Sequence, residues 1–421
     1  MSFADNYLSK QKKHNIIFNN SSKNERFIIV IPCYNEPFVL NTLHSLNNCI
    51  PPKSVIHVII VVNSSEISTK EVIQQNLKSI FEIKSFAEKA NPFFSISIIH
   101  EPELPKKYAG AGLARKIGMD ESVNMFNKKH NPDGIIISLD ADTLVEKNYL
   151  TEIENYYNKN KNANGGILYF EHPVKRKGYN QEIYQAIILY ELYLRYFIEA
   201  LRYCEFPYAF HTIGSCFTVK ADIYVKSGGM NKQHAGEDFY FLHKIFPHGN
   251  FQEINTTCVY PSPRLSERVP FGTGPAIKKI IENNMQFKTF NFNAFTGIKK
   301  LIKLHGKLYN SSTPIIKNHL SLLPKDLKEF LELHNFYEEI KRINMNCSTI
   351  NSFSKHFFNW FSAFRIIKYL NFSHEKYYNK QNIMEVSNKY LCVRNFANNI
   401  SEPFDVLVFY RESQRKTCYK I

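Results

Sequence analysis

Short apolar runs alternate with longer stretches of helical periodicity from Arg26 to about Phe170. The apolar runs, which are rich in β-branched residues, read FIIVIP, HVIIVV, FFSISIIH, GIIISL and GGILYF. Between them, apolar residues recur roughly every three or four positions, which is the spacing of an amphipathic helix. Strands that are apolar on both faces are typical of a parallel sheet covered by helices. We therefore predict an α/β fold with a mostly parallel sheet flanked by helices.

A longer helical pattern follows from Tyr179 to Arg202. Its apolar positions form one continuous stripe, which consists of Ile183, Ile187, Tyr190, Leu194, Phe197 and Leu201. A helix packed across the sheet would bury such a stripe. A helix that lies on a membrane surface is the alternative.

The pattern changes near Pro275, and from there to Ile421 the chain is helical, aromatic and basic. The clearest helices of this region are predicted over 324–343 and 354–370. The chain is accordingly divided into an amino-terminal extension, an α/β domain and a mainly helical region of unassigned role, which span 1–25, 26–274 and 275–421.

Composition narrows the class of protein. The 421 residues are 44% hydrophobic, which is enough for a large core. Lys and Arg outnumber Asp and Glu by 53 to 38, and the formal charge of +15 would attract nucleic acid, anionic lipid or phosphorylated substrates. The sign of the charge does not choose among these three.

The chain contains no apolar run of eighteen residues, and its amino terminus lacks the apolar core of a secretory signal. The eight cysteines are scattered and include no CxxC pair, so we expect reduced thiols and no structural zinc. These features predict a cytoplasmic protein.

The tripeptide Asp140-Ala141-Asp142 ends the apolar run that starts at Ile135. Two carboxylates in the turn after a buried strand can surround a cation that prefers oxygen ligands, such as Mg²⁺ or Mn²⁺. That cation would in turn hold phosphate oxygens. The alternative is a plain strand end, with Asp142 capping a helix that begins at Leu144.

Four segments stand at the ends of predicted strands or the starts of predicted helices: VIPCYNE at 30–36, GAGLARKIG at 110–118, LDAD at 139–142 and AGEDFYFLHK at 235–244. Together and in this order they resemble the family 2 glycosyltransferases, whose GT-A fold is an α/β domain that binds nucleotide sugars. The resemblance covers about Arg26 to Gly274. It implies a GT-A domain followed by the helical region.

The resemblance places the first segment against the nucleoside of the donor, through Pro32, Tyr34, Asn35 and Glu36. The alternative is that Pro37 only ends a strand and that Asn35 and Glu36 open a helix. After the second strand the family usually has an Asp that reads the base, whereas this chain has Asn63. An amide both donates and accepts hydrogen bonds, so the identity of the base stays open.

In the second and third segments the resemblance implies that Arg115 faces the donor, with Lys116 in solvent. A glycine-flanked helix with both cations in solvent is the alternative. Asp142 is the carboxylate expected on Mn²⁺ or Mg²⁺, and Asp140 is expected to bridge the metal site to the ribose or to a metal-bound water. A further histidine ligand is common in such enzymes, and the sequence does not choose among His211, His234, His243 and His248.

In inverting members the aspartate of a pair like Glu237-Asp238 takes the proton from the acceptor hydroxyl, so we assign the base role to Asp238. The alternative is that both acids only favour the dipole of the helix they begin. Farther along, Arg264 and Arg268 precede two glycines and could clamp a pyrophosphate. This last comparison is incomplete, because the Gln and Trp of the corresponding family motif are absent.

The resulting prediction is a metal-dependent, inverting glycosyltransferase that moves a sugar from a nucleotide-diphosphate sugar to a glycan or lipid-linked hydroxyl acceptor. No nucleic-acid partner is expected. The basic amphipathic stretch 298–308 predicts a peripheral contact with an anionic membrane at its inner face, or alternatively a solvated face of a packed helix. The competing functions are a noncatalytic nucleic-acid- or glycan-binding protein on a decayed transferase scaffold, and a nucleotidyltransferase.

Overall fold

The computed structural model describes residues 2–20, 24–175, 178–232, 236–266, 272–396 and 399–421. The chain forms two compact units. The first, here called the sheet unit, comprises 1–187, 212–279 and 413–421. The second, the helical unit, comprises 188–211 and 280–412. The three-part division drawn from the sequence stays a prediction.

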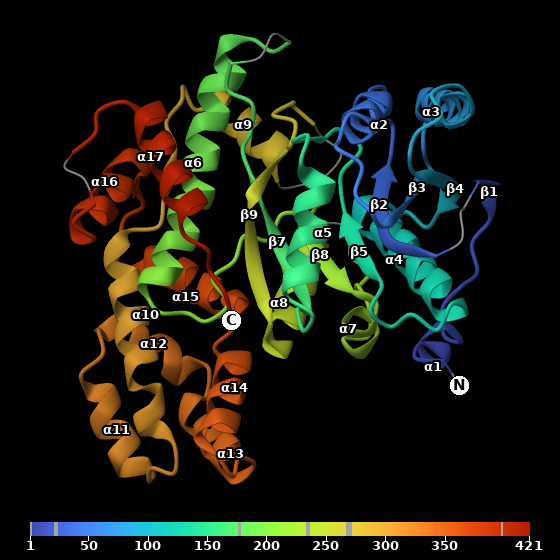
Figure 1. The fold of residues 1–421 in the computed structure, drawn as a ribbon. Helices are drawn as coiled ribbons and strands as arrows, with labels where there is room; N and C mark the ends of the chain where they lie inside the picture. The colour runs from blue at the N-terminus through green and yellow to red at the C-terminus, as the bar shows by residue number, and fades with distance from the viewer. Residues whose placement is uncertain (1, 21–23, 176–177, 233–235, 267–271, 397–398) are drawn as a thin grey trace. The chain divides into compact units, whose positions relative to one another are not determined.

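One sheet organises the sheet unit (Figure 1), and in the described residues its strands follow the order β1-β4-β3-β2-β5-β8-β7-β9-β6. The strands are β1 (Ile16–Asn19), β2 (Glu25–Cys33), β3 (Val55–Ser65), β4 (Ser95–Leu104), β5 (Ile135–Ser138), β6 (Leu144–Val145), β7 (Gly165–Phe170), β8 (Phe217–Lys220) and β9 (Phe251–Tyr260). The β4-β3-β2-β5 part is parallel, whereas β8 runs antiparallel to β5 and β7. The α/β prediction is confirmed.

The register brings several strand ends to one edge of the sheet, which we call the carboxyl edge. Val30 of β2 lies opposite Ser138 at the end of β5, and Pro32 lies opposite Val61 of β3. Because β8 is antiparallel, its first residue, Phe217, also pairs with Ser138. The segments before β8 and after β2, β3 and β5 therefore meet at this edge.

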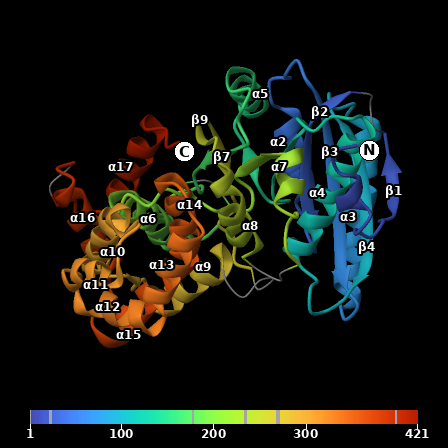
Figure 2. The same ribbon diagram turned by 90° about the horizontal axis from the view of Figure 1, so that it is seen from below.

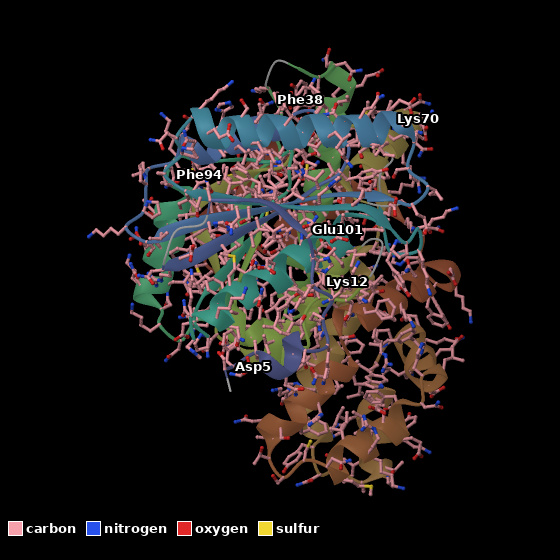
Figure 3. All side chains as sticks on the ribbon, turned by 90° about the vertical axis from the view of Figure 1, so that its right-hand side faces the viewer. Asp5, Lys12, Phe38, Lys70, Phe94 and Glu101 are labelled. Carbon is pink, nitrogen blue, oxygen red and sulfur yellow. The ribbon has the colours of Figure 1, made fainter. Side chains whose placement is uncertain are left out.

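Helices cover both faces of the sheet. They are α1 (Asp5–Leu8), α2 (Val39–Asn47), α3 (Lys70–Lys89), α4 (Ala111–Lys128), α5 (Tyr149–Lys159), α7 (Ala221–Lys226) and α8 (Glu237–Ile245), with a 3₁₀ turn, η1 (Phe246–His248). Figure 3 shows α3 along one face, with Lys70 at its start, and Asp5 of α1 on the other side of the sheet. A Cβ on Gly118 of α4 would lie 2.4 Å from Val30, so this glycine lets α4 approach the strands closely.

The amino-terminal residues belong to the sheet unit. Strand β1 pairs antiparallel with β4. The Tyr7 hydroxyl donates to Asp120 Oδ1 on α4 at 2.6 Å, and Asn127 of α4 donates to Asp5 at 2.7 Å. The segment is thus held to the outer strand and to α4.

The helical unit contains α10 (Phe292–Leu304), η2 (His305–Leu308), α11 (Thr313–Ser321), α12 (Lys325–Leu333), α13 (Phe336–Met345), α14 (Ile350–Trp360), α15 (Ala363–Lys376) and α16 (Ile383–Val393), with the two-stranded sheet of β10 (Lys288–Thr289) and β11 (Gln381–Asn382). Helices α6 (Gln181–Tyr203), α9 (Thr273–Glu282) and α17 (Pro403–Lys416) have residues in both units. Figure 2 gives a second view of these helices.

Two predictions for this region are wrong in detail. Each of the long helices predicted over 324–343 and 354–370 is a pair of shorter helices. Asn335 separates α12 from α13 in a left-handed conformation, with φ 53°, which asparagine tolerates better than most residues. The second break falls at Phe361 and Ser362.

From Ile188 onward the apolar stripe of α6 belongs to the helical unit, where Tyr196 packs edge-on against Phe295.

The basic stretch 298–308 is helix α10 and the turn after it. Most of its apolar side chains are buried in the helical unit: Ile298, Leu301 and Leu308 are each 0% exposed, whereas Leu304 is partly exposed. Most of the apolar face is therefore used for packing, whereas Lys300, Lys303 and Lys307 are exposed, which favours the solvated-face alternative. None of the helices in the described ranges has the length and apolar character needed to cross a bilayer.

Candidate active site

Two side chains of α3 hold the turn after β2 in place by hydrogen bonds. The Asn35 N–H donates to Asn76 Oδ1 at 2.9 Å, and the Ser79 hydroxyl donates to the Glu36 carbonyl oxygen at 2.9 Å. Asn35 is left-handed (φ 47°), and helix α2 begins only at Val39, so Asn35 and Glu36 do not open a helix. Tyr34 and Asn35 are partly exposed, whereas Glu36 is buried.

Asn63 lies at the end of β3, two residues beyond the partner of Pro32. Its side chain is buried, and neither its amide nitrogen nor its amide oxygen has a hydrogen-bond partner within the described residues. Its backbone carbonyl accepts from Asn76 at 2.9 Å. A buried amide without partners is costly, so Asn63 is the kind of group that a ligand can satisfy.

The Asp140-Ala141-Asp142 segment is a turn directly after β5. The Ala141 carbonyl accepts from the Thr42 hydroxyl of α2 at 2.9 Å. The chain then forms the short strand β6, and the next helix, α5, begins at Tyr149. The alternative in which Asp142 caps a helix starting at Leu144 is therefore wrong. The side chains of Asp140 and Asp142 are 35% and 26% exposed.

Arg115 connects this turn to α8. Its side chain is 3% exposed. Its Nε donates to Ser138 Oγ at 3.0 Å and its Nη2 to Asp140 Oδ1 at 2.5 Å, while Nη1 pairs with Glu237. Burial alone would lower the pKa of Arg115, but the carboxylates of Asp140, Glu237 and Asp238 raise it above its usual value. The guanidinium is therefore a permanent cation between the third and fourth predicted segments.

Helix α8 starts with Glu237 and Asp238, directly after Gly236 (φ 70°). Glu237 is buried and Asp238 is partly exposed. Burial and the neighbouring Glu237 charge raise the pKa of Asp238 from 3.8 to about 7, against the opposing effect of Arg115. A carboxyl group that titrates near neutral pH suits a general base. The pair does more than favour the helix dipole, because Glu237 is ion-paired with Arg115.

Arg264 follows β9 and joins the turns after β2 and β5. Its guanidinium pairs with Glu36 and lies 3.0 Å from Asp142 Oδ2. Burial acts to lower the pKa of Arg264, but Asp142 and Glu36 raise it. Arg268, the other predicted clamp residue, lies outside the described residues.

This cluster carries an excess of negative charge. Its carboxylates and guanidinium groups come from Glu36, Asp140, Asp142, Glu237, Asp238, Arg115 and Arg264. Counting only the described residues of the cluster, five carboxylates face two guanidinium groups, which leaves a formal charge of −3 when Asp238 is ionised. A local excess of negative charge favours the binding of a cation.

The described residues contain no group of three or more His, Cys, Asp or Glu side chains placed to hold a metal ion. His243 packs against Phe239, and burial lowers its pKa to about 3. His248 contacts Ser227, His211 belongs to the helical unit, and His234 lies outside the described residues. The donor set fits a Mg²⁺-like ion that takes one or two carboxylates and completes its shell with substrate phosphates and water.

Several supporting residues were not predicted. Asn76 and Ser79 hold the backbone of the turn after β2, and Ser138 and Gly214 hold Arg115. A lone polar or small residue of this kind gives no sequence signal. Lys116 was expected in solvent, which is wrong: it is buried, with Nζ 2.5 Å from Asp120 Oδ2. Asp120 lies four residues after Lys116, and this spacing on a helix could have indicated the ion pair between them.

Comparison with known proteins gives the following matches. Residues 28–227 match the model of glycosyl transferase family 2, which confirms the family resemblance. This range includes the first three segments, and the fourth, at 235–244, lies beyond it. The chain is similar to the crystal structure of S. aureus TarS 1–349 in complex with UDP-GlcNAc, at 12% identity and a TM-score of 0.39, over 80% of this chain and 91% of that one. A second crystal structure of S. aureus TarS is similar at 14% identity and a TM-score of 0.37, over 75% of this chain and 55% of that one. No curated protein matches significantly.

Proposed function

Residues 28–227 form a family 2 glycosyltransferase domain, and from this premise we propose that the protein is a metal-dependent, inverting transferase. It moves a sugar from a nucleotide-diphosphate sugar to a hydroxyl acceptor on a glycan or a lipid-linked molecule. The observation that carries this proposal is the convergence of four distant segments on one edge of the sheet, through the ion pairs of Arg115 and Arg264.

The donor lies along the carboxyl edge in this proposal. Pro32, Tyr34 and Asn35 face the nucleoside, and the unpartnered amide of Asn63 contacts the base. Glu36 accepts from the ribose or the base while it anchors Arg264. Arg264, together with Arg268, clamps the diphosphate, for which a guanidinium offers paired donors.

Asp142 would hold the metal ion, and Asp140 would bridge the metal site to the ribose or to a water of the metal's shell. When bound, Mn²⁺ or Mg²⁺ neutralises the diphosphate leaving group. The excess of carboxylates over guanidinium groups supports a cation here. Because the described residues supply fewer than three clustered ligands, the metal is expected to bind tightly only together with the diphosphate.

Asp238 is the general base, which takes the proton of the acceptor hydroxyl as that oxygen attacks the anomeric carbon opposite the diphosphate. The raised pKa of its carboxyl supports this role, since the group is both ionised and basic near neutral pH. Glu237 supports it by joining the start of α8 to Arg115.

We place the protein in the cytoplasm, a location supported by the lack of any disulfide among the described cysteines. Lysines of α10 and η2, namely Lys299, Lys300, Lys303 and Lys307, provide a purely electrostatic contact with anionic lipid. Cosedimentation with anionic vesicles at low salt tests this contact. It should disappear when these lysines become glutamates, and indifference of the native protein to lipid would refute it.

The experiment that tests the function is an incubation with Mn²⁺ or Mg²⁺ and a panel of UDP-, GDP-, CDP- and dTDP-sugars, with release of nucleoside diphosphate as the readout. A glycosyltransferase releases nucleoside diphosphate from at least one donor, slowly to water and faster to an acceptor. Release of pyrophosphate would indicate a nucleotidyltransferase instead. A protein that neither binds nor cleaves any donor but binds RNA with a steep salt dependence would be the noncatalytic alternative.

A further inference from the structure

Arg115 has little capacity left for a ligand. Each side of its guanidinium already has a partner: Ser138 on Nε, Asp140 on Nη2 and Glu237 on Nη1. The side chain is 3% exposed. Three of its five N–H donors are thus used, and a side chain this buried would have to move away from its partners to reach a donor phosphate, which would leave the buried carboxylate of Glu237 without its cation.

The guanidinium is also confined by the backbone before β8. A Cβ on Gly214 would lie 2.6 Å from Nη2 and 3.0 Å from Cζ of Arg115. The Ser138 hydroxyl, which accepts from Arg115, donates in turn to the Gly214 carbonyl at 2.5 Å. Only glycine leaves room here, so the position of the guanidinium is limited by the backbone at Gly214 as well as by its hydrogen-bond partners.

The two carboxylate partners come from parts of the chain that carry different roles. Asp140 belongs to the turn that we assign to the donor and metal, and Glu237 precedes the base Asp238 on α8. Residues 115 and 237 are 122 positions apart in the sequence. Carboxylates on separate segments repel one another, and one planar cation with several donors can hold two of them at a set spacing.

We propose that Arg115 is a positioning residue that holds the donor-side Asp140 and the start of α8 at a fixed separation, and that it does not bind the donor phosphates. This inference rests on the proposed function. It replaces the donor contact that the family resemblance implied for Arg115. It also explains the glycine at 214, which keeps the space that the guanidinium occupies.

Two variants disturb the contact in different ways. R115K keeps the positive charge but offers a single nitrogen, which cannot bridge both carboxylates in the same geometry. G214A keeps Arg115 itself and displaces its guanidinium. The controls are R342K, at a largely exposed arginine of α13, and G306A, where an added Cβ meets no atom within 4 Å.

The measurements are kcat and donor KM for the active nucleotide sugar of the panel, and calorimetric binding of its nucleoside diphosphate with Mn²⁺. We expect R115K and G214A to lose about 100-fold in kcat, as a misplaced catalytic group typically does, with KM and Kd within about threefold of the native values. A binding stoichiometry that stays near one shows that the loss does not come from unfolded protein. Both control variants should match the native enzyme.

A rise in KM and Kd of about tenfold or more in R115K, with G214A unaffected, would show that Arg115 touches the donor and would overturn the inference. Unchanged kcat in both variants would overturn it as well. A native protein that binds and cleaves no donor would instead overturn the proposed function, and the inference with it.

Discussion

The guanidinium of Arg264 lies 3.0 Å from the carboxylate of Asp142, from Nη2 to Oδ2. The same guanidinium also pairs with Glu36, on the turn after β2. Asp142 is the carboxylate that we assign to the metal ion, so a positive charge already occupies part of its environment. In the proposed function, Arg264 and the metal ion would therefore compete for the same negative charge until the diphosphate brings further oxygens.

This competition predicts that R264Q binds Mn²⁺ more tightly than the native protein when no nucleotide is present. The partly exposed pair contributes about 1 kcal/mol, so the expected gain in affinity is about fivefold. The same variant should raise the donor KM, because the diphosphate loses its clamp. Titration of free Mn²⁺ by electron paramagnetic resonance measures the first effect. Equal Mn²⁺ affinities would refute the competition.

Removal of the metal should stop the reaction. With EDTA, or in D142N, we expect nucleoside diphosphate release to fall at least about 100-fold, because the leaving group loses its counter-charge. Added Mn²⁺ should restore the EDTA-treated protein but not the variant. D133N is the matched control, since Asp133 has a 73% exposed side chain and pairs with Lys220. Full activity in EDTA would exclude metal dependence.

The raised pKa of Asp238 predicts a pH profile. The base must be ionised, so kcat/KM should rise with pH up to the pKa of about 7 and level off above it. D238N should abolish transfer while nucleoside diphosphate binding survives. The profile is measured from about pH 5.5 to about 8.5 with the donor far below KM. Transfer that persists in D238N would place the base elsewhere.

Because the pKa of Asp238 is raised, we also expect the D238N variant to be more stable than the native protein above neutral pH. A carboxyl group whose pKa is raised in the folded state, here to about 7, contributes stability that is lost as the pH rises through that value. D238N carries no such charge, so its Tm at about pH 8 should exceed that of the native protein, with no gain below about pH 4. Equal Tm values at both pH values would argue against the shift.

Asn63 is expected to show opposite effects on stability and binding. Its buried amide has no partner in the described part of the chain, so N63V should raise the free energy of unfolding by about 1 kcal/mol or more. The same change removes the contact to the base and should weaken donor binding about tenfold. Thermal unfolding and calorimetry measure the two effects. A variant that loses stability and binds normally would show a structural role.

Tyr7 connects the amino-terminal segment to α4. Y7F removes its hydrogen bond to Asp120 Oδ1 and should cost about 1.5 to 3 kcal/mol, since the acceptor is charged. Tm should fall by several degrees. Y337F on α13 is the control, because Tyr337 is partly exposed like Tyr7 but its hydroxyl makes no hydrogen bond within the described residues. An unchanged Tm for Y7F would mean that the segment adds no stability to the sheet unit.

Local pattern was sufficient for much of the fold. Apolar runs such as Ile135–Leu139 are long enough for a strand and apolar on both faces, and both properties belong to neighbouring residues. The same reasoning placed Asp140 directly after a strand and Glu237 at the start of a helix. It failed at Asn335, because one residue in a left-handed conformation broke a helix whose periodicity continues on both sides.

The sequence by itself therefore determined the α/β class, the family resemblance and the residues that stand at the carboxyl edge. Only the tertiary structure decided how those residues pair: Arg115 with Asp140 and Glu237, and Arg264 with Glu36 and Asp142. These partners are set by the order β2-β5-β8 and by the path of the chain after β9. Strand order depends on contacts between residues far apart in the chain, which no local periodicity encodes.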